Sequence, residues 1–282
     1  MHNYFRGPIP TATLAASILA VTLAAFPATA QTPPRPAAAA TSRIPRLPDG
    51  KPNLNGIWQT MTTADWDLAP HNAQQSLVLQ AGALLAEPAG IGVVEGGEIP
   101  YLPAALAKKQ ENYKNRITAD PEVKCYLPGV PRATYVPMPF QIFQSAKFMT
   151  IAYEFDGAFR NIYMKDPGPA PADSWMGQSY GKWEGDTLVV DVTGMDSRSW
   201  FDRAGDYHSG DLHVIERYHM VSPEIIDYEA TIDDLKVYSR PWKISMPLYK
   251  HAEKNAQLLE FKCVEFVEDL MYGQFEKKKP TQ

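Results

Sequence analysis

The sequence has 282 residues, of which 45% are hydrophobic, and its formal net charge at pH 7 is −5. A chain with this excess of acidic residues lacks the electrostatic attraction that a phosphate backbone offers to basic proteins, so we expect no nucleic-acid partner. The length allows one sizeable core, and nothing in the composition calls for a second domain.

The first thirty residues have the pattern of a secretory signal. One positive charge, Arg6, precedes the apolar run 14–26, and Ala28-Thr29-Ala30 forms a small-residue cleavage site. The run is shorter than the roughly 20 residues that a membrane-spanning helix needs. We therefore predict cleavage after residue 30, a periplasmic or secreted location, and no integral membrane segment in the mature protein. Residues 31–43, rich in Pro and Ala, predict a disordered linker, and residues 44–282 a single domain.

Two cysteines, Cys125 and Cys263, remain after removal of the signal. An even number in an oxidising compartment favours one disulfide between them, and the alternative is two separate buried thiols. Neither cysteine has the CxxC spacing of a metal site.

Residues 44–130 contain nine prolines, which interrupt long regular elements. One short helix is predicted over 104–116, and we expect it to cover an end of the fold.

From Phe140 onward, apolar and polar residues alternate in short segments, which indicates β-strands in an antiparallel meander. Closing the sheet removes its exposed edges, so the predicted fold class is all-β, an antiparallel up-and-down, lipocalin-like barrel. A two-layer sandwich is the alternative, because its strands alternate in the same way. The predicted strands are 140–145, 148–155, 159–164, 177–183, 187–193, 211–219, 225–233, 241–247 and 258–264.

A tight turn at 184–186 joins two of these strands, since Gly185 can take the positive φ that a hairpin needs. In the strand after the turn, Leu188, Val190 and Val192 share one face. This is the alternation expected of a sheet with one buried face.

Residues 195–210 form a long loop between two strands, and long loops at a barrel mouth often carry ligand contacts. We interpret this loop as a lid. His208 within it is a candidate general acid or base, because imidazole titrates near neutral pH, and Asp202 or Asp206 would orient it. The alternative is an exposed loop histidine.

Arg160 lies in a predicted strand, and a buried guanidinium requires an anion. Glu154, Glu216 or a ligand carboxylate would supply that anion. The candidate catalytic residues are His208, Arg160, Tyr153 and Tyr180, the tyrosines offering hydroxyl groups to a pocket. The candidate substrate-binding residues are Trp175, Trp200, Glu216, Arg217 and Tyr228.

No metal or other cofactor is expected. His213 and His219 share the parity of one strand face, but no third ligand stands at a suitable spacing. The alternative is a polar row that faces solvent. The chain also lacks the P-loop and GxGxxG motifs of nucleotide-binding proteins.

Four motifs resemble those of a large group of exported, lipocalin-like β-proteins of proteobacteria and acidobacteria, most of them without an assigned function. Two further positions differ from that group. The segment Gly157-Ala-Phe-Arg160 often begins with His in the group, and His often stands at the position of Val264. The resemblance implies that any site built from those histidines is altered here. The motifs are Pro48-Asp-Gly-Lys-Pro-Asn-Leu-Asn-Gly-Ile-Trp58, Cys125-Tyr-Leu-Pro-Gly-Val-Pro-Arg132, Gly181-Lys-Trp-Glu-Gly-Asp-Thr-Leu-Val-Val-Asp191 and His208-Ser-Gly-Asp-Leu-His-Val-Ile-Glu-Arg217.

An aromatic-lined barrel with an arginine and a proton-transfer group suits a cofactor-independent lyase or isomerase that acts on a small hydrophobic aromatic compound. Decarboxylation or elimination on a lignin-derived aromatic dimer is one concrete version. The alternative is a non-catalytic periplasmic binding protein for a lipid or aromatic ligand. The sequence leaves the oligomeric state open.

Overall fold

The computed structural model describes residues 43–75, 86–267 and 270, all within the unit formed by residues 41–282. The predicted secretory signal lies outside the described residues, and so does the predicted linker except for Arg43. Both therefore stay predictions.

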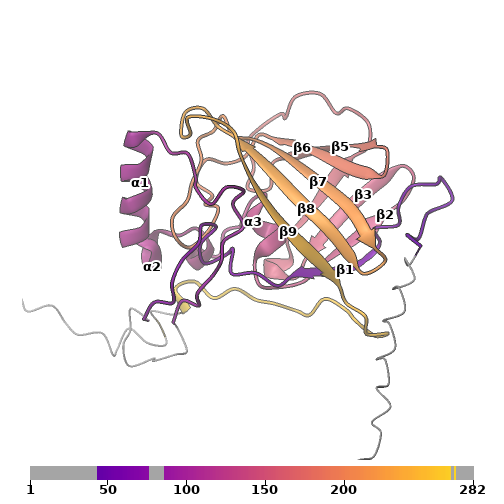
Figure 1. The fold of residues 1–282 in the computed structure, drawn as a ribbon, viewed down its shortest axis with the longest axis horizontal. Helices are drawn as coiled ribbons and strands as arrows, with labels where there is room; N and C mark the ends of the chain where they lie inside the picture. Colours follow the sequence, from indigo (N-terminus) through magenta and orange to yellow (C-terminus); the bar gives the residue numbers. More distant parts are fainter. Residues whose placement is uncertain (1–42, 76–85, 268–269, 271–282) are drawn as a thin grey trace, which may run out of the picture. The chain divides into compact units, whose positions relative to one another are not determined.

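The described residues form a closed barrel of nine strands (Figure 1). The predicted all-β barrel is confirmed, and closure rules out the two-layer sandwich. The strands are β1 (Gly56–Thr60), β2 (Phe140–Gln144), β3 (Phe148–Tyr153), β4 (Phe159–Tyr163), β5 (Gln178–Glu184), β6 (Thr187–Thr193), β7 (His213–Ser222), β8 (Ile225–Asp233) and β9 (Trp242–Lys250).

The strand that closes the barrel comes from the proline-rich region. β1 pairs antiparallel with β2 on one side and with β9 on the other. The prediction of a strand at 258–264 is wrong, because those residues have no regular structure. With β1 between β2 and β9, the barrel offers no free edge to a further strand.

One strand pair departs from the predicted antiparallel meander. β4 and β5 run parallel, with Ile162 opposite Ser179 and Tyr163 opposite Tyr180. A parallel pair needs a connection of a dozen or more residues, because the chain must return to the end from which it started. Residues 164–177 supply that length, and Pro167, Pro169 and Pro171 keep them irregular.

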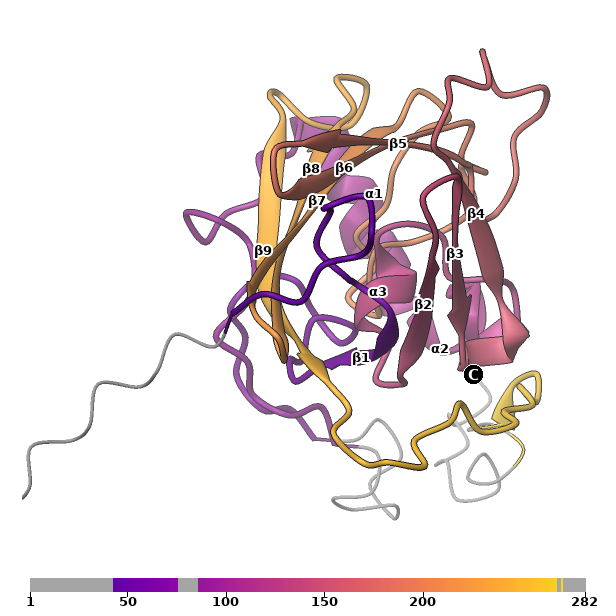
Figure 2. The ribbon, with the colours of Figure 1, turned by 90° about the vertical axis from the view of Figure 1, so that its right-hand side faces the viewer.

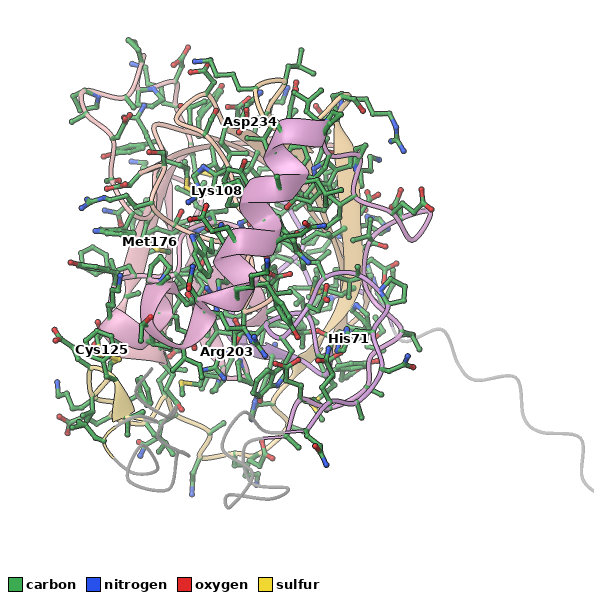
Figure 3. All side chains as sticks on the ribbon, turned by 90° about the vertical axis from the view of Figure 1, so that its left-hand side faces the viewer. His71, Lys108, Cys125, Met176, Arg203 and Asp234 are labelled. Atoms are coloured by element: carbon green, nitrogen blue, oxygen red, sulfur yellow. A yellow bond between two sulfur atoms is a disulfide. The ribbon has the colours of Figure 1, made fainter. Side chains whose placement is uncertain are left out.

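The helices are few and short. α1 (Pro103–Lys114) confirms the predicted helix, and proline at its start fits the first helical turn. α2 (Arg116–Ala119), α3 (Arg132–Tyr135) and the 3₁₀ turns η2 (Glu122–Lys124) and η3 (Phe155–Gly157) are each a single turn. Figure 3, viewed from the side of α1, shows this helix in front of the barrel. No helix in the described part of the chain has the length and apolar character needed to span a membrane.

The hydrophobic core lies inside the barrel. Leu188, Val190 and Val192 of β6 are buried there, as their alternation predicts. In Figure 2 the strands β2–β4 and β7–β9 form opposite walls, with α3 between them. Large side chains point into the interior, among them Trp58, Phe140, Tyr153, Tyr218, Tyr228 and Trp242.

The predicted disulfide is confirmed. Cys125 and Cys263 are bonded, with their Cα atoms 5.5 Å apart. The bond holds the segment that follows β9 against the chain just after η2.

Candidate functional site

A cluster of charged and hydroxyl groups is buried inside the barrel. Arg160 on β4 donates to Glu216 Oε2 on β7 at 2.7 Å, and to Tyr218 Oη at 3.0 Å. The hydroxyls of Tyr218 and Tyr228 donate to Glu216 Oε1 at 2.9 and 2.8 Å. No member is more than 3% exposed. Of the anions considered for Arg160, the structure therefore supplies Glu216.

Strand periodicity brings these groups together. Glu216 and Tyr218 are two residues apart on β7, so both point inward while Arg217 points outward. Tyr218 lies opposite Tyr228 in the β7–β8 register. Tyr228 and Glu216, both expected to bind substrate, thus lie in one cluster with Arg160.

The apolar interior strengthens the charge interactions in this cluster. Burial, the largest single influence, would lower the pKa of Arg160, but the charge of Glu216 and the neighbouring tyrosines together outweigh it and raise that pKa well above its usual value. Burial, followed by the charge of Glu216, raises the pKa values of Tyr218 and Tyr228 well above normal. Both hydroxyls therefore stay protonated and act as donors at neutral pH.

Three further donors in the interior have no hydrogen-bond partner among the described residues. They are Tyr153 Oη, Arg160 Nε and Trp242 Nε1. The Tyr153 hydroxyl lies beside Arg160 and Thr134 without reaching hydrogen-bonding geometry with either. Burial raises the pKa of Tyr153 to about 12, although the charge of Arg160 acts in the opposite direction. Buried unpaired donors are uncommon in proteins, so three of them in one interior mark a place for an acceptor.

These donors lie near the same end of the barrel. Strand directions place the end of β3, the start of β4 and the start of β9 at the end where β6 finishes and β7 begins. Residues 194–212, here called the covering loop, join β6 to β7 across this end. Phe201 in the loop packs edge-on against Trp242, and its carbonyl accepts from Tyr135 of α3 at 2.8 Å. The loop predicted to be a lid thus covers the end of the barrel where the unpaired donors lie.

His208 lies in the covering loop and is only 2% exposed, so the alternative of an exposed histidine is wrong. Its Nδ1 donates to the carbonyl of Ser209 at 2.7 Å. Burial lowers the pKa of His208, which keeps the ring neutral. Its Nε2 then accepts the hydroxyl of Ser199 at 2.7 Å. Asp202 and Asp206, predicted to orient His208, instead lie together with Asp67 in a separate cluster.

A second buried ion cluster lies outside the barrel interior and escaped the sequence analysis. Arg132 of α3 donates to Asp65 and to Asp120, both at 2.8 Å, and also contacts Glu122. Burial, together with the charge of Asp65, raises the pKa of Glu122 to about 8 in spite of Arg132. The motif that ends at Arg132 was the only sequence signal for this cluster.

Several predicted site residues do not reach the interior. Tyr180 and Arg217 point outward from β5 and β7, because they alternate with inward-facing neighbours. Trp175 stacks on Tyr126 with their ring centroids 4.6 Å apart, outside the barrel. Trp200 is buried within the covering loop. These positions correct the expectation that all four would line one pocket.

His213 and His219 lie on the outer face of β7, as their parity predicts. His213 pairs with Asp191 at 2.9 Å, and His219 with the hydroxyl of Thr187 at 3.1 Å. Six residues of strand separate the two rings by about 20 Å, too far for one metal ion.

The chain matches no protein-family model, no curated protein and no solved structure. The resemblance to exported β-proteins therefore stays a prediction. Fold and site together define a closed nine-stranded barrel with a buried arginine, glutamate and tyrosine cluster, and with unpaired donors beneath a covering loop.

Proposed function

We propose that this protein is a cofactor-independent lyase or isomerase of the periplasm or the secreted fraction, and that its substrate is a small, hydrophobic aromatic compound. The substrate would bind inside the barrel and place an oxygen atom against Tyr153 and Arg160. The observation that carries the proposal is the set of unpaired donors Tyr153 Oη, Arg160 Nε and Trp242 Nε1.

The donor chemistry supports a reaction that builds negative charge on oxygen. Decarboxylation, elimination and double-bond isomerisation all develop such charge on an oxygen conjugated with the reacting carbon. Preorganised donors in a water-excluded site stabilise that charge strongly. Since the pKa of Tyr153 is raised to about 12, its hydroxyl would serve as a hydrogen-bond or proton donor and not as a base.

The ion pair with Glu216 supports the same role for Arg160. Glu216 offsets the charge of the guanidinium and occupies its Nη2 atom, which leaves Nε–H as the unpaired donor. The surroundings of the pair are apolar, with Ile151, Ile162 and Val190 buried around it. Such surroundings favour a mainly hydrophobic guest with one polar oxygen.

Access to this site would require movement of the covering loop. Tyr153, Arg160 and Trp242 are each 3% exposed, so a guest reaches them from solvent only if covering side chains move, among them Phe201, which packs on Trp242. A proton-transfer role for His208 would run through Ser199, whose hydroxyl donates to its Nε2. His208 would thus be a positioning residue of the covering loop.

A periplasmic binding protein for an aromatic or lipid ligand is the second candidate. One observation favours it: Tyr153, Tyr218, Tyr228 and Arg160 all keep their protons at neutral pH, because burial or Glu216 raises their pKa values. These four protonated groups can hold an acceptor, but none of them acts as a base. Reactions that need no base, such as decarboxylation, stay compatible with it.

The test compares two tyrosine variants. Native mass spectrometry of protein purified from its own host would show whether an aromatic molecule is bound. Turnover would be followed by liquid chromatography with a hydroxycinnamic acid and with a lignin-model β-aryl ether dimer as probes. We expect Tyr153→Phe to lower kcat/KM by about 10²- to 10³-fold, the usual cost of removing one oxyanion donor.

Tyr180→Phe is the matched control, because it removes the same hydroxyl from the outer face of β5. It should leave kcat/KM unchanged. Binding of a probe without conversion would assign the protein to the binding candidate. No bound molecule and no conversion, or equal activity of Tyr153→Phe and wild type, would overturn the proposal.

A further inference from the structure

Three aspartates from two loops come together outside the barrel interior. Asp67 belongs to the segment after β1, and Asp202 and Asp206 belong to the covering loop. One carboxylate oxygen from each lies within 4.8 Å of the other two. Asp202 and Asp206 are 0% and 1% exposed, and Asp67 is partly buried.

The backbone fixes the orientation of Asp202. Its Oδ2 accepts the N–H of Leu68 at 2.9 Å, and its Oδ1 accepts the N–H of Asp206 at 3.0 Å. The first of these bonds ties the covering loop to the segment after β1, and the second lies within the covering loop. Figure 3 labels Arg203 and His71, close in sequence to Asp202 and Asp67, and both lie on the side of the barrel that carries α1.

Asp206 provides a second, separate sign of a ligand. Its Oδ1 accepts the hydroxyl of Tyr101 at 2.6 Å and has Lys109 Nζ at 4.0 Å. Its Oδ2 is buried and has no partner among the described residues. A carboxylate oxygen without a donor is costly at this depth, and the nearest groups on the cluster side are two further carboxylates.

The three carboxylates lie close to one another, and the Lys109 ammonium stands 4.0 Å from Asp206 Oδ1. Lys109 and His71 both act to lower the pKa of Asp67. Burial and the charge of Asp206 raise the pKa of Asp202 well above normal, and the same two causes raise the pKa of Asp67. Burial is the larger of the two causes, and the charge of Asp206 adds to it.

We propose that Asp67, Asp202 and Asp206 bind one calcium ion, which would fasten the covering loop to the segment after β1. Calcium is held by oxygen ligands at about 2.3–2.6 Å, so two oxygens on opposite sides of the ion stand about 4.6–5.2 Å apart. The separations in the cluster fall within that limit. The three ligands include no thiolate or imidazole, which argues against zinc.

Calorimetric titration of the EDTA-treated mature protein with CaCl₂ at pH 7.5 tests the proposal, together with thermal melting in CaCl₂ and in EDTA. We expect one site per chain and a higher melting temperature with calcium. Asp206→Asn should weaken calcium binding at least tenfold. Asp227→Asn, an exposed aspartate on the outer face of β8, is the matched control and should bind calcium like wild type.

In EDTA, the difference in melting temperature between Asp206→Asn and wild type should have the opposite sign from that in calcium. Asp206→Asn removes one of three repelling charges, so it should melt at a higher temperature than wild type in EDTA and at a lower one in calcium. If Asp206→Asn does not fold, Asp67→Asn at the less buried position carries the same expectations. A protein that shares a proton in this cluster would show no calcium heat and equal melting temperatures in calcium and EDTA, and that result would overturn the proposal.

Discussion

At the scale of single residues, Glu216 holds the buried charged cluster of the barrel interior together. It accepts from Arg160, Tyr218 and Tyr228 and is 0% exposed. Removing one partner of a buried pair leaves the other charge without compensation, which costs more than the pair itself contributes. The stability of the cluster therefore depends on the complete set of partners.

Glu216→Gln should lower the free energy of unfolding by about 3–5 kcal/mol, because it leaves the Arg160 guanidinium uncompensated in an apolar interior. Urea denaturation followed by tryptophan fluorescence measures the change. Glu184→Gln, which removes an exposed partner of Arg217 on the outer face, is the control and should leave the urea midpoint unchanged. Equal midpoints for Glu216→Gln and wild type would show that the buried pair is not required.

The raised pKa of Glu122 predicts a pH dependence of stability. Its folded-state pKa is about 8, against 4.5 in the unfolded chain, so between these values the folded state holds a proton that the unfolded state lacks. The stability from this proton is complete below pH 4.5 and is lost as the pH rises through 8, at up to about 1.4 kcal/mol per pH unit.

Glu122→Gln removes that titration while keeping a neutral side chain of similar shape. Relative to this variant, the wild type should lose stability steadily between pH 5 and pH 8 in urea melts. Groups such as His208 and Asp202 titrate in both proteins, so the difference between the two curves isolates Glu122. Parallel curves over this range would contradict the prediction.

At the scale of elements, the segment after β9 is held by side chains, a disulfide and single backbone hydrogen bonds, such as that from Phe266 N–H to the carbonyl of Val123 at 2.8 Å, instead of strand pairing. Phe261 stacks on Phe155 at 5.3 Å, and the N–H of Leu259 donates to Glu154 at 2.7 Å. Neither contact belongs to the barrel ladder. The bond between Cys125 and Cys263 therefore contributes much of the attachment of this segment.

Replacing both cysteines by serine should release this segment and lower global stability. The bond closes a loop that contains β2–β9, so its removal should cost about 2–4 kcal/mol, less than the upper limit of chain-entropy models. Limited proteolysis should cut within residues 251–267 faster in the variant than in wild type. An unchanged cleavage rate would mean that the segment stays in place without the disulfide.

The elements also show how far sequence reasoning reaches. β5 to β8 follow from alternation over seven or more residues and from the turn at Gly185. β1 has five residues in a proline-rich context, too short to give a periodic signal. Residues 258–264 alternate like a strand, but β1 already occupies the edges of β2 and β9, and Leu259 and Val264 stay exposed.

The candidate site was predictable where strand parity decides it. Arg160 needed an anion, and Glu216 stood on the inward face of its strand, so their pairing was one of few possibilities. The aspartate cluster was not predictable, because Asp67 and Asp202 are far apart in sequence and meet only through loop packing. Irregular loops have no repeating hydrophobic pattern from which contacts between their side chains could be predicted.

At the scale of the whole barrel, closure depends on one short strand. β1 joins β2 to β9, and without it the two would become exposed edges. Trp58 at its centre is 0% exposed, and its indole N–H donates to the carbonyl of Leu54 at 2.8 Å. Trp58 is therefore the largest buried side chain of the strand on which closure depends.

Trp58→Ala should lower the free energy of unfolding by about 3–5 kcal/mol, because it leaves a large cavity beside Phe140 that the surrounding barrel cannot fill. The loss should also be local: hydrogen exchange should quicken most in β1 and in the residues of β2 and β9 that pair with it, and least in β6–β8. Phe143→Ala, which removes a half-exposed ring from the outer face of β2, serves as the control and should change neither quantity by much. If exchange in Trp58→Ala rose equally in all nine strands, β1 would be one part of a single cooperative unit, and the barrel would open as a whole instead of at its closing strand.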